Sequence, residues 1–321
     1  MPSIVDRLAE ATVVFSYGRA GYHRRRKTWA DPDLALDLSG RRILVTGGTS
    51  GVGLALCDML TDRGAHVLVG ARNRAKAERL IAERSDSAGQ WSIVEVDVSS
   101  RASVRAAVDA LVAEGRPLDA LVNNAGVMIH ERARSVDDVE LTWATNVFGG
   151  WGLTLGLRPL LADGGGRVVH VTSGGMYAHK LDVDDPYQEA ASSWDGVKAY
   201  AQTKRAQVVL NEILAERLAG DGITSNAMHP GWANTPGVED ALPRFYRLLE
   251  NQLRTPAEGA DTAAWLAVSP ECASETGQLW LDRVSRSTYV VPGTRESDDD
   301  RRVLVRMCEA WWAGEHPAPR G

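Results

Sequence analysis

The chain has 321 residues, of which 44% are hydrophobic and 24% are charged, and its formal net charge is −6. This composition excludes a largely disordered chain, a collagen-like fibre and a small domain held together by disulfides. The mild acidity argues against a general nucleic-acid-binding protein, because such proteins usually carry an excess of positive charge.

The first 39 residues form an extension that precedes the regular strand pattern. Four apolar residues within 4–15 share one face of a predicted helix: Ile4, Leu8, Ala11 and Phe15. A basic cluster follows at 23–27, and an apolar face beside positive charge favours contact with an anionic membrane surface. Residues 1–27 are therefore a candidate peripheral-membrane element; the alternative is that this helix docks on its own domain.

The three cysteines, Cys57, Cys272 and Cys308, suit neither a disulfide framework nor a zinc site. No cluster of His, Cys and Asp residues indicates a metal. No apolar run reaches the ~18 residues of a membrane-spanning helix. We expect a reducing, cytoplasmic location, with membrane association as the open alternative.

Between residues 40 and 296, short apolar strands alternate with helices and no polar linker divides the chain. Strands are predicted at 42–45, 66–69, 93–96, 118–122, 167–171, 223–228 and 278–281. A helix is predicted over 54–63, Ser99 or Ser100 caps a later one, and residues 255–258 resemble a capping box. This alternation predicts an α/β fold, a single Rossmann-type doubly wound parallel sheet with helices on both faces.

The C-terminal segment 297–321 is a second extension. Residues 298–312 are predicted to form a charged helix with Trp311 and Trp312 packing inward. The chain therefore divides into an extension over 1–39, a catalytic domain over 40–296 and a C-terminal helix and tail.

A glycine-rich turn, Thr46-Gly47-Gly48-Thr49-Ser50-Gly51-Val52-Gly53, joins the first strand to the first helix. Glycine lacks a Cβ, so the turn is tight and its backbone approaches a pyrophosphate closely. The helix N-terminus adds free N–H groups and the positive end of a dipole. A glycine turn alone also occurs for compactness, but this position predicts cofactor contacts: Gly47, Thr49, Ser50, Gly51, Val52 and Gly53.

The second strand ends in Gly70-Ala71-Arg72-Asn73-Arg74, without the acidic residue that binds the ribose 2′-hydroxyl of NAD(H). Arginine binds a phosphate through two hydrogen bonds. We therefore predict NADP(H) in preference to NAD(H), with Arg72 and Asn73 in contact with the cofactor. The alternative is that Arg72 and Arg74 only solvate a surface loop.

Two further segments follow predicted strands and face the same cofactor. Asp97 and Val98 are placed beside the adenine. The run Asn123-Asn124-Ala125-Gly126 is placed along the inner edge of the cofactor, with Asn123, Ala125 and Gly126 as predicted contacts.

Tyr200 and Lys204 lie four positions apart in a predicted helix and therefore share one face. A tyrosine with its ordinary pKa of about 10 is a poor acid or base at neutral pH. A nearby ammonium group lowers that pKa and makes proton transfer feasible. Alone, however, such a pair is usually an incidental pair on a helix surface.

Taken together, the motifs resemble the short-chain dehydrogenase/reductase family over about residues 40–292. They occur in one order: the glycine-rich turn, Asn123-Asn124-Ala125-Gly126, Asn146, Val171-Thr172-Ser173, Tyr200 with Lys204, and His229-Pro230-Gly231. The resemblance implies an oxidoreductase that interconverts a carbonyl and an alcohol by hydride transfer. It also implies that Pro230 and Gly231 contact the cofactor.

The resemblance assigns a role to each matching residue. Tyr200 is implied to be the general acid for carbonyl reduction or the base for alcohol oxidation. Lys204 is implied to lower its pKa and to hold the nicotinamide ribose, while Ser173 binds the substrate oxygen. Asn146 is implied to hold a water in a proton relay to Lys204, and Thr235 to orient the carboxamide. The cofactor supplies the hydride.

A narrower resemblance connects the chain with one branch of this family. The segments Ser173-Gly174-Gly175-Met176, 200–205 and 229–238 are similar to the branch that includes mammalian member 12. That branch lies close to retinol-dehydrogenase-like enzymes, which mostly prefer NADP(H). It does not define a substrate.

Two features depart from the common family pattern. Ser173 and Tyr200 are 27 positions apart, and the intervening stretch contains Tyr177, His179, Trp194 and an acidic run at 182–185. We expect that stretch to form a loop over the active site. At the last strand, Asp282-Arg283-Val284 replaces Asp-Gly-Gly, which argues against the usual tetramer and for a monomer or dimer.

The remaining aromatic residues allow two interpretations. Trp151, Trp194 and Trp232 lie near pocket segments and suit an apolar substrate, but core packing explains them equally well. We expect His170 to be structural and His229 to pack near the cofactor.

The sequence thus predicts an NADP(H)-dependent oxidoreductase for an apolar carbonyl or alcohol. A small-molecule substrate is the expected partner, and nucleic acid is not. One alternative is a non-catalytic dinucleotide-binding sensor or scaffold. Another is a dehydrogenase that acts on a lipid or isoprenoid at a membrane surface.

Overall fold

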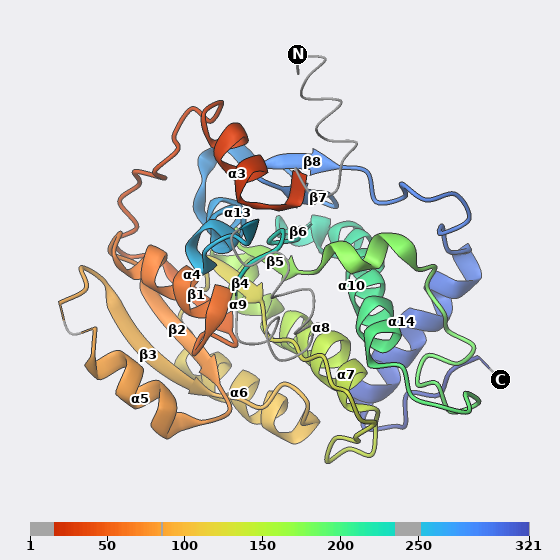
Figure 1. Ribbon diagram of the computed structural model, residues 1–321. Coiled ribbons are helices and arrows are strands. Elements are labelled where there is room, and N and C mark those ends of the chain that lie inside the picture. The colour runs from red at the N-terminus through yellow and green to blue at the C-terminus, as the bar shows by residue number, and fades with distance from the viewer. Residues whose placement is uncertain (1–15, 85, 235–251, 321) are drawn as a thin grey trace.

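The computed structural model describes residues 16–84, 86–234 and 252–320. Its centre is an eight-stranded sheet in the order β3-β2-β1-β4-β5-β6-β7-β8 (Figure 1). The strands are β1 (Arg42–Thr46), β2 (His66–Ala71), β3 (Gln90–Glu95), β4 (Ala120–Asn123), β5 (Arg167–Val171), β6 (Thr224–Met228), β7 (Leu279–Leu281) and β8 (Val284–Arg286). Strands β1 to β7 are parallel, and β8 pairs antiparallel with β7. The predicted α/β fold with a doubly wound sheet is confirmed.

Helices cover both faces of this sheet and form two separate cores. One face carries α4 (Gly51–Thr61), α5 (Arg74–Ala82) and α13 (Pro256–Val268). The other carries α6 (Arg101–Glu114), α7 (Leu141–Trp143), α8 (Gly149–Gly156), α9 (Arg158–Asp163), α10 (Gly196–Leu218) and α14 (Asp298–Ala313). Because both faces are covered, central strands such as β1 are buried throughout, which explains their uninterrupted apolar runs.

Local capping signals fix several helix ends as the sequence predicts. The Ser100 side chain accepts a hydrogen bond from the Ser103 backbone N–H and begins α6. Thr255 and Glu258 form a capping box at the start of α13, with Pro256 in the first turn. Trp311 of α14 is fully buried, as predicted, whereas Trp312 is partly buried.

Some elements differ from the sequence prediction. Strand β3 begins three residues earlier than expected, and α4 begins at Gly51 within the glycine-rich turn itself. Helix α5, capped by the Asn73 side chain, and the short strand β8 were not predicted. Strand β8 has only three residues and no buried side chain, so it carries no hydrophobic pattern.

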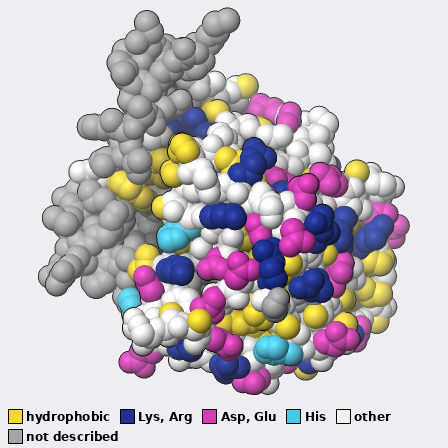
Figure 2. Space-filling view, turned by 90° about the vertical axis from the view of Figure 1, so that its right-hand side faces the viewer, with side chains coloured by type: hydrophobic (Ala, Val, Ile, Leu, Met, Phe, Trp, Pro, Cys, Tyr) yellow, Lys and Arg dark blue, Asp and Glu magenta, His cyan; other side chains and the backbone are white. Residues whose placement is uncertain are grey.

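Helix α3 (Arg19–Arg26) contains most of the basic cluster of the N-terminal extension and lies beside β7 and β8 in Figure 1. The amphipathic helix predicted within 4–15 lies outside the described residues. Within the described part of the chain, no helix is both long and apolar enough to cross a membrane. On the face shown in Figure 2, basic and acidic side chains of the described residues are interspersed.

Candidate active site

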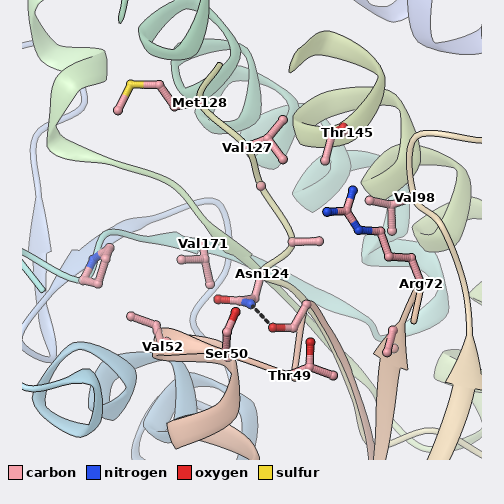
Figure 3. A pocket seen from close by; sticks show the side chains of 18 of the residues that line it. Thr49, Ser50, Val52, Arg72, Val98, Asn124, Val127, Met128, Thr145 and Val171 are labelled. Atoms are coloured by element: carbon pink, nitrogen blue, oxygen red, sulfur yellow. Dashed lines mark hydrogen bonds between the residues drawn. The ribbon is translucent and has the colours of Figure 1, made fainter. Parts of the chain in front are cut away.

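A pocket of about 520 Å³ lies at the carboxyl edge of the sheet, where the strand order reverses between β1 and β4. In open α/β sheets this reversal separates the loops and leaves a crevice for a ligand. Figure 3 shows side chains from the segments after β1, β2, β3 and β4 around the pocket, together with Val171 at the end of β5. Predicted site residues that line it are Gly47, Thr49, Ser50, Gly51, Val52, Gly53, Arg72, Asn73, Asp97, Val98, Ala125, Gly126, Ser173, Tyr200, Lys204, Pro230 and Gly231.

The glycine-rich turn forms one wall of this pocket, and its positions Gly47 and Gly53 leave no space for a Cβ. Gly47 has a φ of +67°, in the left-handed region that favours glycine. A Cβ on Gly53 would lie 2.4 Å from both the Asn124 Nδ2 and the Gly47 carbonyl oxygen. Ser50 precedes α4 without a side-chain cap, so the first backbone N–H groups of this helix are available to an anion. The wall therefore fits a dinucleotide pyrophosphate.

Asn124, which belongs to the run expected along the inner edge of the cofactor, holds this wall against β4. Its Nδ2 donates to the Thr46 carbonyl oxygen at 2.8 Å and to that of Gly47 at 3.4 Å. Its backbone N–H donates to the Thr46 Oγ1 at 3.0 Å. Asn124 therefore positions the turn, and the sequence signal was its place directly after a buried strand.

Arg72 and Lys76 bring positive charge to the pocket at the end of β2. In Figure 3 the Arg72 side chain extends beside Val98, on the side of the pocket away from Val52. Arg74 instead donates to the Glu78 Oε1 at 2.9 Å on the exposed surface of α5. Of the two arginines, only Arg72 is directed into the pocket, and Lys76 was not predicted.

The opposite end of the pocket contains Ser173, Tyr200 and Lys204. Ser173 follows β5, whereas Tyr200 and Lys204 come from successive turns of α10. The Lys204 Nζ lies 5.4 Å from the centre of the Tyr200 ring and donates to the Val171 carbonyl oxygen at 2.9 Å. A hydrogen bond joins the Ser173 and Tyr200 side chains. Three groups with proton-transfer and hydrogen-bonding capacity thus meet at one place.

Burial controls the protonation of these groups. It raises the pKa of the Tyr200 phenol above its ordinary value, and the hydrogen bond from Ser173 opposes only part of this effect. Burial also lowers the pKa of the Lys204 ammonium to about 7. The predicted lowering of the Tyr200 pKa by Lys204 is therefore not present in this structure, because burial outweighs it and also weakens the positive charge of Lys204.

Asn146 lies beside these groups, within a single π-helical turn (Ala144–Phe148) between α7 and α8. Its Oδ1 accepts from the Val127 backbone N–H at 2.8 Å, and its Nδ2 donates to the Thr203 Oγ1 at 2.9 Å. A Cβ on Gly126 would lie 3.3 Å from both the Asn146 Oδ1 and the Lys204 Nζ. The side chain thus fixes the loop after β4 next to Lys204 and does not itself line the pocket.

Two predicted cofactor contacts are not among the pocket residues. Asn123 is buried behind the pocket, where its Nδ2 donates to the Thr154 Oγ1 at 3.1 Å. As the last residue of β4 it points toward α8, because side chains alternate along a strand. Thr235 lies outside the described residues. Asn124, from the predicted run 123–126, does line the pocket. Pocket residues that were not predicted as contacts are Gly70, Ala71, Lys76, Val96, Val127, Met128, Thr145, Val171, Thr172 and Ala233.

We expect the long stretch between Ser173 and Tyr200 to form a loop over the active site, and this stays a prediction. Its residues 174–199 are absent from the pocket lining. The acidic run lies against the C-terminal tail: Arg320 pairs with Asp184 at 3.4 Å, and the Tyr187 hydroxyl donates to the Pro317 carbonyl oxygen at 2.6 Å. These contacts hold this part of the stretch against the C-terminal tail.

The predicted aromatic and histidine residues separate into core and loop positions. Trp151 is fully buried in the core on the α8 face, so it packs in the core and does not contact a substrate in the pocket. His170 is buried in β5. His229 is buried beside the pocket loop, and burial together with nearby arginines lowers its pKa to about 3. Among the described residues no group of His, Cys, Asp and Glu is arranged to hold a metal ion.

The comparisons with known proteins agree with this geometry. The family model described as short chain dehydrogenase matches residues 41–244. Dehydrogenase/reductase SDR family member 12 from Bos taurus is 37% identical over 298 residues, which cover 91% of this chain and 93% of that protein. Retinol dehydrogenase 14 from Mus musculus is 31% identical, with 81% and 82% covered.

A solved structure shows the same architecture. The 3-ketoacyl-(acyl-carrier-protein) reductase from Brucella melitensis, complexed with NADH, is 28% identical, with a TM-score of 0.59. The match covers 75% of this chain and 96% of that one.

Proposed function

This chain belongs to the short-chain dehydrogenase/reductase family of oxidoreductases that interconvert carbonyls and alcohols, and on that premise we propose that it uses NADP(H) to convert an apolar substrate. The observation that carries the proposal is the convergence of Ser173, Tyr200 and Lys204 at one end of a pocket whose other end is a glycine cradle. When bound, the nicotinamide supplies or accepts a hydride. The protein's own residues then bind the substrate oxygen and move the proton.

Tyr200 is the proposed proton donor for carbonyl reduction. Because burial raises the pKa of its phenol, the side chain carries its proton at neutral pH, which is the form that reduction needs. The Ser173 hydroxyl, already hydrogen-bonded to Tyr200, is placed to bind the same substrate oxygen. For alcohol oxidation Tyr200 must first lose its proton, so this direction is favoured at alkaline pH.

The preference for NADP(H) rests on Arg72 and Lys76. Both line the pocket near the end of β2, whereas the acidic residue of its lining, Asp97, follows β3 and accepts hydrogen bonds from Ser99. Among the described residues the Arg72 guanidinium makes no ion pair, so its charge is available to the cofactor. Asn73 supports this arrangement, because its Oδ1 accepts from the Lys76 backbone N–H at 2.9 Å and starts α5.

The first test is turnover of NADPH with a panel of aldehydes and ketones. We expect Tyr200→Phe to lower kcat at least ~100-fold, because general acid catalysis typically contributes 10²–10⁴-fold, while NADPH still binds. Tyr187→Phe is the matched control, since it removes a buried hydroxyl that bonds Pro317 in the core. Undiminished turnover in Tyr200→Phe contradicts the proposed acid. Binding without turnover by the wild type across a broad panel supports the sensor alternative.

The second test separates the two arginines after β2. Arg72→Ala should weaken NADPH binding roughly 10- to 100-fold, because a hydrogen bond to a charged group contributes about 1.5–3 kcal/mol. NADH binding should change little, so the preference is lost. Arg74→Ala is the control, because Arg74 pairs with Glu78 on the surface. Equal effects of both variants on NADPH would contradict the assignment.

Location and assembly complete the proposal. The three cysteines are buried and free, which supports a reducing, cytoplasmic setting.

Strand β8 extends the sheet beyond β7, and this added edge supports a monomer or dimer instead of the common tetramer. Membrane contact through residues 1–27 is tested by flotation with anionic vesicles, and failure to float removes it.

A further inference from the structure

The N-terminal segment from Ser16 onward is joined to the catalytic domain by buried charges. The Asp282 carboxylate accepts from the Arg25 Nη1 at 2.8 Å and from both terminal nitrogens of Arg254, at 2.5 and 2.9 Å. Arg25 also donates to the Ser16 carbonyl oxygen at 3.0 Å. The side chains of Arg254 and Asp282 are each 1% exposed. A carboxylate between two guanidinium groups therefore fixes this segment to the turn after β7.

Arg283, next to Asp282, holds the part of the N-terminal segment that contains Trp29 and Asp31. Arg283 forms a two-point ion pair with Asp261 of α13, at 2.8 and 2.9 Å. Its guanidinium also donates to the Asp31 carbonyl oxygen at 2.6 Å and lies 4.1 Å from the centre of the Trp29 ring. Asp282 and Arg283 both have positive φ angles, so this turn keeps charged side chains where glycine is favoured. Their contacts with the extension offset that backbone strain.

This anchoring places Tyr17 between two loops of the active site. The Tyr17 ring stacks on His229 with a centroid distance of 4.8 Å, and its carbonyl oxygen accepts from the Trp232 N–H at 3.0 Å. A Cβ on Gly174 would lie 2.8 Å from the Tyr17 Cε1, and Gly174 directly follows Ser173. The Tyr17 ring thus touches the loop that holds Ser173 and the loop that contains the pocket residues Pro230 and Gly231.

The rings around Tyr17 form a mostly apolar surface, which we call the aromatic wall: Tyr17, Tyr177, His229 and Trp232. Tyr177 and His229 meet edge to face with ring centres 6.1 Å apart, one of the arrangements that aromatic pairs favour. The Tyr17 and Tyr177 hydroxyls are hydrogen-bonded to each other, which satisfies their polar ends. Tyr17, Tyr177 and Trp232 are each only partly buried, so some ring surface is accessible.

We propose that Tyr17, a residue of the N-terminal extension, is a specificity-determining residue that contacts the apolar part of the substrate beyond Ser173. This rests on the proposed function. The class of substrate is a carbonyl or alcohol with an aromatic or long alkyl group next to the reacting carbon. The reacting oxygen lies at Ser173 and Tyr200, and the apolar group lies along the aromatic wall.

The experiment compares kcat/KM for a small aldehyde, such as propanal, with that for aromatic and long-chain aldehydes. Tyr17→Ala should lower kcat/KM for the large substrates about tenfold, since lost apolar contacts in a pocket change discrimination by 10- to 200-fold. The value for the small aldehyde should stay within about twofold, because it does not reach the wall. Tyr17→Phe retains the ring and should keep the wild-type ratio of kcat/KM for the large aldehydes to kcat/KM for the small one.

Two further variants keep the result interpretable. Tyr22→Phe, in α3 of the same extension, keeps a ring that packs on Trp29 and Arg254 and should leave the ratio of the two kcat/KM values unchanged. If Tyr17→Ala does not fold, Gly174→Ala is the substitute, because its Cβ would lie 2.8 Å from the Tyr17 Cε1 and displace the ring. It should lower kcat/KM for the large aldehydes relative to the small one. An unchanged ratio in Tyr17→Ala overturns the proposal. So does an equal loss for all substrates accompanied by weaker NADPH binding, which indicates a structural role. Absence of wild-type turnover instead defeats the proposed function itself.

Discussion

Lys204 is a lysine whose burial has a measurable consequence without any substrate. Its Nζ donates to the Val171 carbonyl oxygen, and its side chain is 3% exposed. Burial lowers its pKa to about 7, whereas an exposed lysine titrates near 10.4. Between these two values the unfolded chain holds a proton that the folded chain does not. Stability should therefore rise with pH over this range.

This linkage predicts the behaviour of Lys204→Met in the cofactor-free protein. The wild type should gain about 2 kcal/mol of unfolding free energy between pH 7 and pH 9 from this one residue. The variant should lack that gain, because methionine does not titrate. Denaturant unfolding at pH 7, 8 and 9 measures it. Lys198→Met, which removes a half-exposed lysine of the same helix, is the control. Identical pH slopes for wild type and Lys204→Met would refute the buried-charge account.

The proposed role of Tyr200 as the acid predicts the pH dependence of turnover by the same reasoning. Its pKa is raised by burial, so kcat/KM for reduction should be flat around neutral pH and fall at alkaline pH. The rate of alcohol oxidation should instead rise across that alkaline range. Steady-state profiles in both directions measure this. A decline of reduction already below pH 7 would show that another group supplies the proton.

At the scale of elements, the start of α4 can pack against the glycine-rich turn only because residue 53 has no Cβ. Gly53→Ala would bring a Cβ within 2.4 Å of the Gly47 carbonyl oxygen, which is backbone and cannot move aside. We expect NADPH affinity to fall at least tenfold, because the turn must open, with a lower Tm as well. Isothermal titration and thermal unfolding measure both.

Gly220→Ala is the matched control for that variant, because an added Cβ there meets nothing within 4 Å. It should leave cofactor affinity unchanged. If Gly53→Ala also binds NADPH with wild-type affinity, the glycine turn is not the pyrophosphate cradle.

Elements with strong local patterns were predictable from the sequence, and those fixed by distant contacts were not. Strand β5 agrees with the prediction at both ends, because its five residues form a nearly continuous buried run. Strand β8 has no such pattern and exists because β7 pairs with it. The position of Tyr17 depends on Gly174 and Trp232, more than 150 residues away, so no local periodicity could indicate it. Lys76 was overlooked because helix α5, which carries it into the pocket, was not predicted.

For the whole molecule, the described part of the N-terminal extension and the catalytic domain share one network of contacts. The Arg63 side chain donates to the Leu34 carbonyl oxygen, and Asp282 binds both Arg25 and Arg254. These contacts cross the boundary that the sequence predicts near residue 40. We therefore expect the extension and the domain to unfold together.

Asp282→Asn tests whether the buried ion pairs hold the extension to the domain. It leaves two buried guanidinium groups without their counter-charge, and breaking such a buried pair costs about 3–5 kcal/mol. Glu309→Gln is the control, because the Arg217–Glu309 pair is half-exposed and should contribute less than about 1 kcal/mol. Chemical denaturation compares the two. A single transition with a large loss for Asp282→Asn is expected; similar small losses for both variants would show that the network does not hold the extension.

The central claim is that the chain transfers a hydride from NADPH to a carbonyl with Tyr200 as the acid. Its most direct test uses NADPH deuterated at the transferred position of C4, an aromatic aldehyde and mass spectrometry of the alcohol product. We expect one deuterium per product molecule with the wild type and at least ~100-fold less product with Tyr200→Phe. Alcohol without deuterium, or equal labelled product from Tyr200→Phe, would contradict that claim.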